Sequence, residues 1–157
     1  MNKSTVYDKF NGYNAYPTGS GEELIRGKLI ELFDKIIGKN EACLVKARDR
    51  GLEKLLSRIL TVKKRMYRIK GEMNRIDRGA EYRFEKIIQN DESALREVDV
   101  SLENTISQCA ELLDSLSCME TDMHISEKFA VMDRLLREIE RLFHQRLEIF
   151  KKMRVYG

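Results

Sequence analysis

Apolar residues recur in alternating steps of three and four along most of the chain, which is the spacing of one face of an α-helix. The longest unbroken series lies between residues 52 and 80 and has the heptad spacing of a coiled-coil seam. A second series lies between residues 95 and 123, and Ile106 and Leu113 widen it enough to meet two neighbours. The first series comprises Leu52, Leu55, Ile59, Val62, Met66, Ile69, Met73, Ile76 and Ala80, and the second Leu95, Val98, Leu102, Thr105, Cys109, Leu112, Leu116, Met119 and Met123.

Two further helices flank these series. Ser20 and Glu23 have the spacing of a capping box, which predicts the start of the first helix. We expect that helix to end in a turn near Gly51 and a kink, if any, at Gly38. The last helix is predicted to start after residues 121–126, with Ser126 as its cap. The first helix carries Ile25, Leu29, Leu32, Phe33 and Ile36, and the last Phe129, Met132, Leu136, Ile139, Phe143, Leu147, Phe150 and Met153.

These elements predict an all-α protein, an elongated antiparallel bundle of about four helices with coiled-coil-like heptad seams. The only proline is Pro17, so no residue from 18 to 157 is barred from a helix by a missing amide donor. We expect residues 1–19 to be a flexible tail and residues 20–157 to be one helical domain. The chain is expected to turn between Asp77 and Gly79.

Charge is divided by segment. Residues 46–78 hold twelve Lys and Arg against four acids, whereas residues 85–127 hold eleven acids against Lys86 and Arg96. The overall net charge of +3 conceals this division. Since charges beside a seam select partners in coiled coils, we expect the basic and acidic helices to be antiparallel neighbours.

The cysteine content and the hydropathy of the chain indicate its cellular compartment. The cysteines are odd in number and widely spaced, at Cys43, Cys109 and Cys118, which is typical of core thiols in a reducing compartment. No apolar run approaches the roughly 18 to 20 residues that a membrane span needs. The sequence therefore predicts a cytoplasmic protein that is not inserted in a membrane.

The residues offer no catalytic constellation, metal site or cofactor motif. The histidines, His124 and His144, have no nucleophile placed beside them. There is no Glu-x-x-His motif for a di-metal bundle, and Cys109 and Cys118 are too far apart in sequence for a zinc finger. The glycines are scattered singly, so there is no glycine-rich phosphate-binding loop. We therefore expect neither an enzyme nor a bound cofactor.

The basic stretch at residues 63–78 is the one candidate for nucleic acid. Its only aromatic residue is Tyr67, and the acidic segment of the same chain is available to neutralise it. The sequence accordingly favours protein over nucleic acid as the partner.

The tail carries an aromatic residue at every third position, at Tyr7, Phe10, Tyr13 and Tyr16. One interpretation is a disordered tail that happens to contain these rings. The other is a strap whose rings dock on the apolar groove of the bundle.

Two stretches of the chain, residues 13–25 and 41–64, carry motifs that resemble those of known protein families. The run YNAY at residues 13–16, followed by SGEELI at residues 20–25, is similar to the opening of the flagellin export chaperones. Residues 41–64, with EACL, GLEKLL and a lysine pair, resemble the hook-filament-junction chaperones. The resemblance covers part of the chain and implies a non-catalytic chaperone that keeps an axial protein unpolymerised until export. It makes Tyr13 and Tyr16 a strap over a groove and the last helix a docking surface.

We therefore expect a helical protein-binding module, in which the opposed charges are satisfied internally and the tail and last helix are left for a partner. The alternative is a structural coiled-coil homo-oligomer whose seams are filled by copies of the chain. Methionines at seam positions are either adaptable contacts for a partner or core filler. The expected partner-binding residues are Tyr7, Phe10, Tyr13, Tyr16, Phe129, Met132, Leu136, Phe143, Phe150 and Met153.

Overall fold

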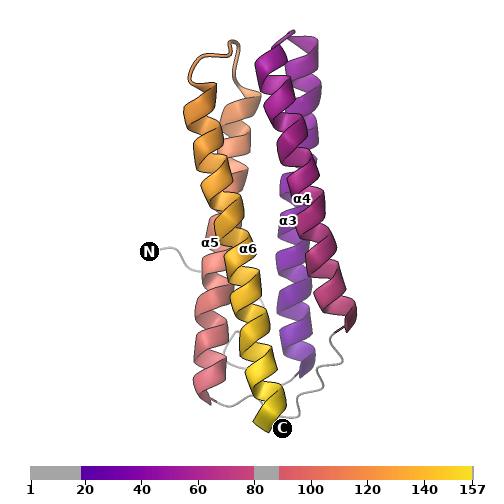
Figure 1. Cartoon of the computed structure of the whole chain (residues 1–157), viewed down its shortest axis with the longest axis vertical. Helices are drawn as coiled ribbons and strands as arrows, with labels where there is room; N and C mark the ends of the chain where they lie inside the picture. The colour runs from indigo at the N-terminus through magenta and orange to yellow at the C-terminus, as the bar shows by residue number, and fades with distance from the viewer. Residues whose placement is uncertain (1–18, 80–88, 157) are drawn as a thin grey trace.

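The computed structural model describes residues 19–79 and 89–156, with side-chain surroundings given for residues 24–74 and 93–149. The described residues form the helices α3 (Gly19–Asp49), α4 (Glu53–Gly79), α5 (Gln89–Ser117) and α6 (Ile125–Tyr156). Helices α3 and α4 make one hairpin, and α5 and α6 make a second one beside it (Figure 1). The all-α bundle expected from the sequence is confirmed.

The bundle has a square cross-section with an open side. Helix α3 packs closely on α4 and on the parallel helix α5, and α5 packs closely on α6. Helices α4 and α6 also run parallel, but they make by far the sparsest contact of the four neighbouring pairs. The α4–α6 side is therefore the loosest seam of the bundle.

The predicted apolar series form the core. Each described member of the series is buried or half-buried, except Met123, which is 67% exposed. Met123 and Met119 lie beyond the end of α5 at Ser117, so the prediction that the second series continues through them as helix was wrong. The 3-and-4 spacing persists by coincidence into the loop that joins α5 to α6.

The turn predicted near Gly51 is confirmed, and α3 runs through Gly38 without a break. Gly51 has a φ of 67°, a left-handed conformation that glycine adopts without a steric penalty. The Leu52 amide donates to the Ala47 carbonyl at 3.0 Å and the Gly51 amide to the Arg48 carbonyl at 3.2 Å. This pair of bonds is a Schellman motif, which satisfies the last carbonyls of α3.

The other helix ends agree less closely with the sequence. Helix α3 begins at Gly19, one residue before the expected cap. Helix α4 continues through Asp77 to Gly79, so the prediction that the chain turns between these two residues was wrong. A single glycine costs a helix about 1 kcal/mol and does not by itself end it. Helix α6 begins at Ile125, so Ser126 is inside the helix and is not its cap. The capping position belongs to His124, which has a φ of 61° and whose carbonyl accepts the Lys128 amide at 3.3 Å.

The expected pairing of the basic and acidic helices was wrong. Helices α4 and α5 lie at opposite corners of the bundle, because each of them packs against α3 and α6 (Figure 1). Four cations of α4, Lys63, Arg65, Arg68 and Lys70, pair with other helices instead. Lys63 and Lys70 meet Glu41 and Asp34 of α3 at 3.0 and 2.8 Å, whereas Arg65 meets Asp133 and Glu140 of α6.

Two acids of α5 are likewise matched by α3 and α6. Asp114 pairs with Lys39 of α3 at 2.6 Å. Asp99 accepts two hydrogen bonds from Arg146 of α6, at 2.7 and 3.3 Å, and both side chains are almost completely buried. A buried, bidentate ion pair of this kind depends on its geometry, since either charge alone would be costly in the core.

Candidate binding groove

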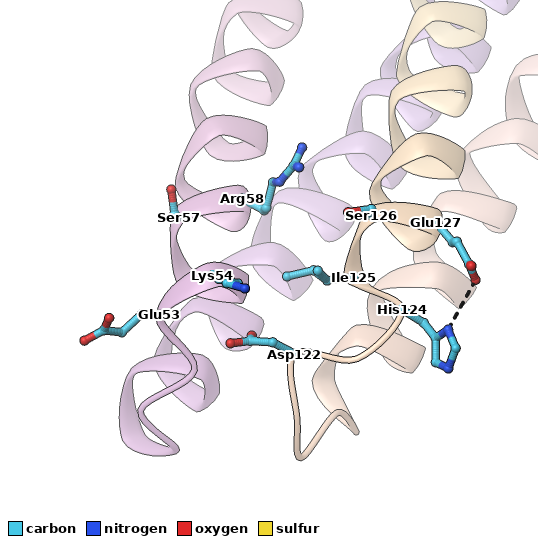
Figure 2. Close-up of a pocket in the computed structure, with 9 residues that line it drawn as sticks. All are labelled: Glu53, Lys54, Ser57, Arg58, Asp122, His124, Ile125, Ser126 and Glu127. Carbon is cyan, nitrogen blue, oxygen red and sulfur yellow. Dashed lines mark ion pairs between the residues drawn. The ribbon is translucent and has the colours of Figure 1, made fainter.

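A groove follows the loose α4–α6 seam from the loop end of the bundle. The cavity at the loop end has a volume of about 760 Å³ and lies between the first turns of α4 and α6 (Figure 2). It is called the upper cavity because the loops are at the top of Figure 1. The lower cavity, of about 330 Å³, continues along the same two helices and shares Arg58 and Ser126 with the upper one. The upper cavity is lined by Glu53, Lys54, Ser57, Arg58, Asp122, His124, Ile125, Ser126 and Glu127, and the lower by Arg58, Thr61, Val62, Arg65, Ser126, Phe129, Ala130, Met132, Asp133 and Leu136.

Small side chains account for the groove. Ser126 and Ala130 are one turn apart on α6, and both are exposed where the helix faces α4. Ser57 and Thr61 have the same spacing on the opposite wall. Because none of these side chains reaches across the seam, the helices leave a space there that larger residues would fill.

The floor of the lower cavity is apolar, whereas its rim is polar. Val62 on α4 and Phe129, Met132 and Leu136 on α6 contribute to the core and also line this cavity. Val62 and Phe129 are 8% and 6% exposed and form the accessible floor, whereas Met132 and Leu136 are fully buried directly beneath it. The far end is closed by ion pairs, since Arg65 binds Asp133 and Glu140 while Arg137 binds Asp133 at 3.0 Å.

The loops hold the upper cavity in shape. An oxygen of Asp122, from the α5–α6 loop, accepts the Leu55 amide at 3.1 Å and so caps the first turn of α4. Arg50, from the α3–α4 loop, donates to the carbonyls of Ser117 and Met119 at 3.0 and 2.6 Å, which caps the end of α5. Each hairpin loop thus completes a helix terminus of the other hairpin.

The charged residues that line the upper cavity are two cations, Lys54 and Arg58, and three acids, Glu53, Asp122 and Glu127. Figure 2 shows Lys54 and Arg58 extending from the side of α4 that faces α6, whereas Glu53 and Glu127 extend away from the cavity. Glu127 lies 3.5 Å from the ring of His124. No ion pair joins Lys54 or Arg58 to another of the described residues. The helix N-termini at the cavity add positive partial charge.

The residues that the sequence assigned to a partner are distributed unevenly. Phe129, Met132 and Leu136 come together at the lower cavity, and Phe143 is buried in the core two turns beyond Leu136 along α6. Phe150 and Met153 belong to α6, but their side chains lie outside those described. The tail residues Tyr7, Phe10, Tyr13 and Tyr16 also lie outside the described residues. Their roles in binding stay predictions.

Sequence reasoning missed the rim of the groove, namely Lys54, Arg58, Thr61 and Ala130. Two signals point to it in retrospect. Ser126 and Ala130 are small residues at i and i+4 on one face of a helix, and Lys54 and Arg58 are cations at i and i+4 on another. Neither signal can be used until the two faces are known to be opposed.

The groups with possible chemistry lie apart from one another. His144 is 4.0 Å from Glu72 and is exposed. Burial raises the pKa of the Cys43 thiol to about 11 and that of Cys109 to about 12, so neither is an ionised nucleophile at neutral pH. Within residues 19–79 and 89–156, no group of three or more His, Cys, Asp or Glu side chains is placed to hold a metal ion.

Comparison with family models, curated proteins and solved structures gives no match to the chain. None of the helices in the described part of the chain contains an apolar stretch long enough to cross a membrane. The case for function therefore rests on the groove.

Proposed function

We propose that this protein is a helical protein-binding module that holds a segment of a partner in the α4–α6 groove. The observation that carries the proposal is an open groove with an apolar floor, along one seam of a bundle whose other seams are closely packed. A groove of this shape suits the apolar face of an amphipathic helix. The finer form of the proposal, taken from the resemblance of residues 13–25 and 41–64, is a cytoplasmic export chaperone that keeps a flagellar axial protein from self-assembling.

Burial within one chain favours this function over a structural homo-oligomer. The described apolar positions of the α4 seam, from Leu55 to Met73, are at most 8% exposed in a single copy. Copies of the chain are therefore not needed to cover the seams. Four of the seven basic side chains described in α4, those of Lys63, Arg65, Arg68 and Lys70, each pair with an acid of α3 or α6, which weakens the case for nucleic acid.

The test blocks the groove without disturbing the core. Ala130 is exposed and lines the lower cavity, so Ala130→Trp places a large ring in the space that a partner would occupy. Ala42 is an exposed alanine of α3 away from the groove, so Ala42→Trp is the matched control. Wild type and Ala42→Trp are expected to capture the same protein from native lysate, and Ala130→Trp to lose it.

The chaperone activity has its own measurement. The captured protein, once purified, is expected to polymerise by light scattering when alone and to stay monomeric with equimolar wild-type chain. Capture that is unchanged by Ala130→Trp would contradict a role for the groove. A tight homodimer or homotetramer at nanomolar concentration, seen by size exclusion with light scattering, would favour the structural alternative.

A further inference from the structure

We infer that the α4–α6 groove selects an acidic amphipathic helix and orients it antiparallel to α4 and α6, with its acidic C-terminal end in the upper cavity. This inference rests on the proposed function and names the chemistry and direction of the partner segment. It follows from three features of the described residues: unpaired cations at one end of the groove, an apolar floor along its middle, and a closed far end.

The cations set the charge of the occupant. Lys54 and Arg58 extend toward α6 in Figure 2, are both exposed, and have no ion-pair partner among the described residues. Of the three acids that line the upper cavity, Asp122 caps α4, Glu127 lies beside His124, and Glu53 extends away from the cavity in Figure 2. The upper cavity thus offers two cations to carboxylates from outside the chain.

The helix dipoles set its direction. Helices α4 and α6 both begin at the upper cavity, at Glu53 and Ile125, so their positive ends lie side by side there. The C-terminal end of a bound helix carries negative partial charge, and so it is favoured at this end of the groove. A helix placed in this way runs antiparallel to both walls.

The apolar floor and the closed end set its length. From Ile125 at the upper cavity to Leu136 at the lower one, α6 rises about 16 Å, at about 1.5 Å per residue. The pairs of Arg65 with Asp133 and Glu140, about one turn before and one turn after Leu136 on α6, close the groove at its far end. A helix of about three turns, with apolar residues at i, i+3 or i+4 and i+7, matches the open length.

A second copy of the chain fits this description less well. The acidic helix is α5, and the large apolar side chains exposed in the described part of the chain are Leu24, Val45, Leu60, Tyr67 and Met123. None of these belongs to α5, so its exposed face has charge but lacks apolar residues for the floor. The occupant is accordingly a segment of a different protein.

The experiment uses three synthetic 18-residue helical peptides, stapled on the solvent face so that all are equally helical. Each has leucine on one stripe. The first has three glutamates in its last turn, the second has them in its first turn, and the third has lysines in its last turn. Fluorescence anisotropy at low salt is expected to show the first peptide binding about tenfold more tightly than the other two, an advantage that shrinks as salt screens the charges.

Charge-reversal variants assign the effect to the upper cavity. Lys54→Glu with Arg58→Glu is expected to remove the advantage of the first peptide and to favour the third. Lys35→Glu with Lys64→Glu is the matched control, because both lysines are exposed, lie outside the groove and have no ion pair in the described part of the chain. This control changes the net charge equally and is expected to preserve the order of the peptides.

The possible outcomes separate this inference from the proposed function. Equal binding of the first two peptides, or an equal loss in both double variants, would overturn the acidic, oriented helix, even when Ala130→Trp abolishes capture of the native partner. The expected peptide order with unchanged capture by Ala130→Trp would instead reject the proposed function. A labelled DNA duplex or a second copy of the chain that displaces the first peptide would also overturn the inference.

Discussion

Helix α6 has two neighbours, and its contacts with them differ in kind. Against α5 it buries the ion pair of Arg146 with Asp99, and Met132 meets the Cys109 thiol at a sulfur-to-sulfur distance of 3.4 Å. Against α4 it presents Ser126 and Ala130 and leaves a groove. The same helix thus closes one seam with large buried side chains and opens the other with small exposed ones.

The difference between the α5–α6 and α4–α6 seams shows how α4 is held in place without close packing against α6. Its attachment on this side comes from rim ion pairs, such as Arg65 with Glu140, and from the Asp122 cap at the loop end. Exposed ion pairs and caps contribute little stability compared with buried contacts. The open side is therefore the weaker part of the bundle, which is consistent with a surface that exchanges a partner.

The largest expected difference is between the ion pairs of the two seams. Asp99→Ala is expected to lower the free energy of unfolding by about 3 to 5 kcal/mol, because it removes a carboxylate from the buried Arg146 guanidinium. Asp133→Ala is expected to cost about 1 kcal/mol or less, because its partners Arg65 and Arg137 stay partly solvated. Urea unfolding measures both values. Equal losses of unfolding free energy in Asp99→Ala and Asp133→Ala would contradict the difference between the two seams.

The second prediction compares filled and unfilled positions. Ala47→Leu adds volume at a site of α3 that is 1% exposed, and it is expected to destabilise the fold by about 1 to 3 kcal/mol through overpacking. Ala130→Leu adds the same atoms beside the groove and is expected to change stability by no more than about 0.5 kcal/mol. Thermal unfolding of the two variants tests this, and a large loss for Ala130→Leu would mean that the groove is not open in solution.

The third prediction uses the buried thiol of the closed seam. Burial raises the pKa of Cys109 to about 12, whereas an unfolded thiol ionises near 8.5. Above that lower value the unfolded chain loses the thiol proton first, so stability falls as pH rises, by up to about 1.4 kcal/mol per pH unit. Urea unfolding between pH 8 and 10, values chosen to bracket the start of this fall, is expected to show a shallower slope for Cys109→Ala.

Cys118 supplies the control for that slope. It is exposed in the α5–α6 loop, so Cys118→Ala is expected to keep the wild-type dependence on pH. Cys43, whose pKa is raised to about 11, contributes to the slope in all three proteins and so does not affect the comparison. The same slope in Cys109→Ala and wild type would show that the closed seam admits water.

The smallest expected effect concerns the loop that frames the groove. Asp122→Ala is expected to cost about 1 kcal/mol, because it removes the side-chain cap from the Leu55 amide. Glu120→Ala, an exposed change in the same loop, is expected to stay within about 0.5 kcal/mol of wild type. Differential scanning calorimetry of both variants checks the difference. A loss for Glu120→Ala as large as that for Asp122→Ala would count against the cap.

Much of the local structure was predictable from the sequence, and the failures have a common cause. The turn at Gly51 was found because glycine, unlike other residues, readily adopts the left-handed backbone needed there. The end of α5 was missed because Met119 and Met123 keep the helical spacing past Ser117. That end is capped by Arg50, which is distant in sequence, and no local pattern reports such a contact.

The candidate site was predicted in the same partial way. Phe129, Met132 and Leu136 were found from their spacing on one helix, and they form the floor of the lower cavity. Arg58 and Ala130 were missed because they matter through the helix that each one faces. A charge or a small side chain has no assigned role until its neighbour is known.

The sequence by itself determined which segments are helical and which face of each is buried, because helical periodicity and turn chemistry are local properties. Only the tertiary structure decided which helices are neighbours. Amphipathic stripes of similar width are interchangeable, and the opposed charges of residues 46–78 and 85–127 pointed to a pairing that the bundle does not contain. Placing α4 beside α6 opposed their small residues and left Lys54 and Arg58 facing a cavity. The groove is a product of that placement.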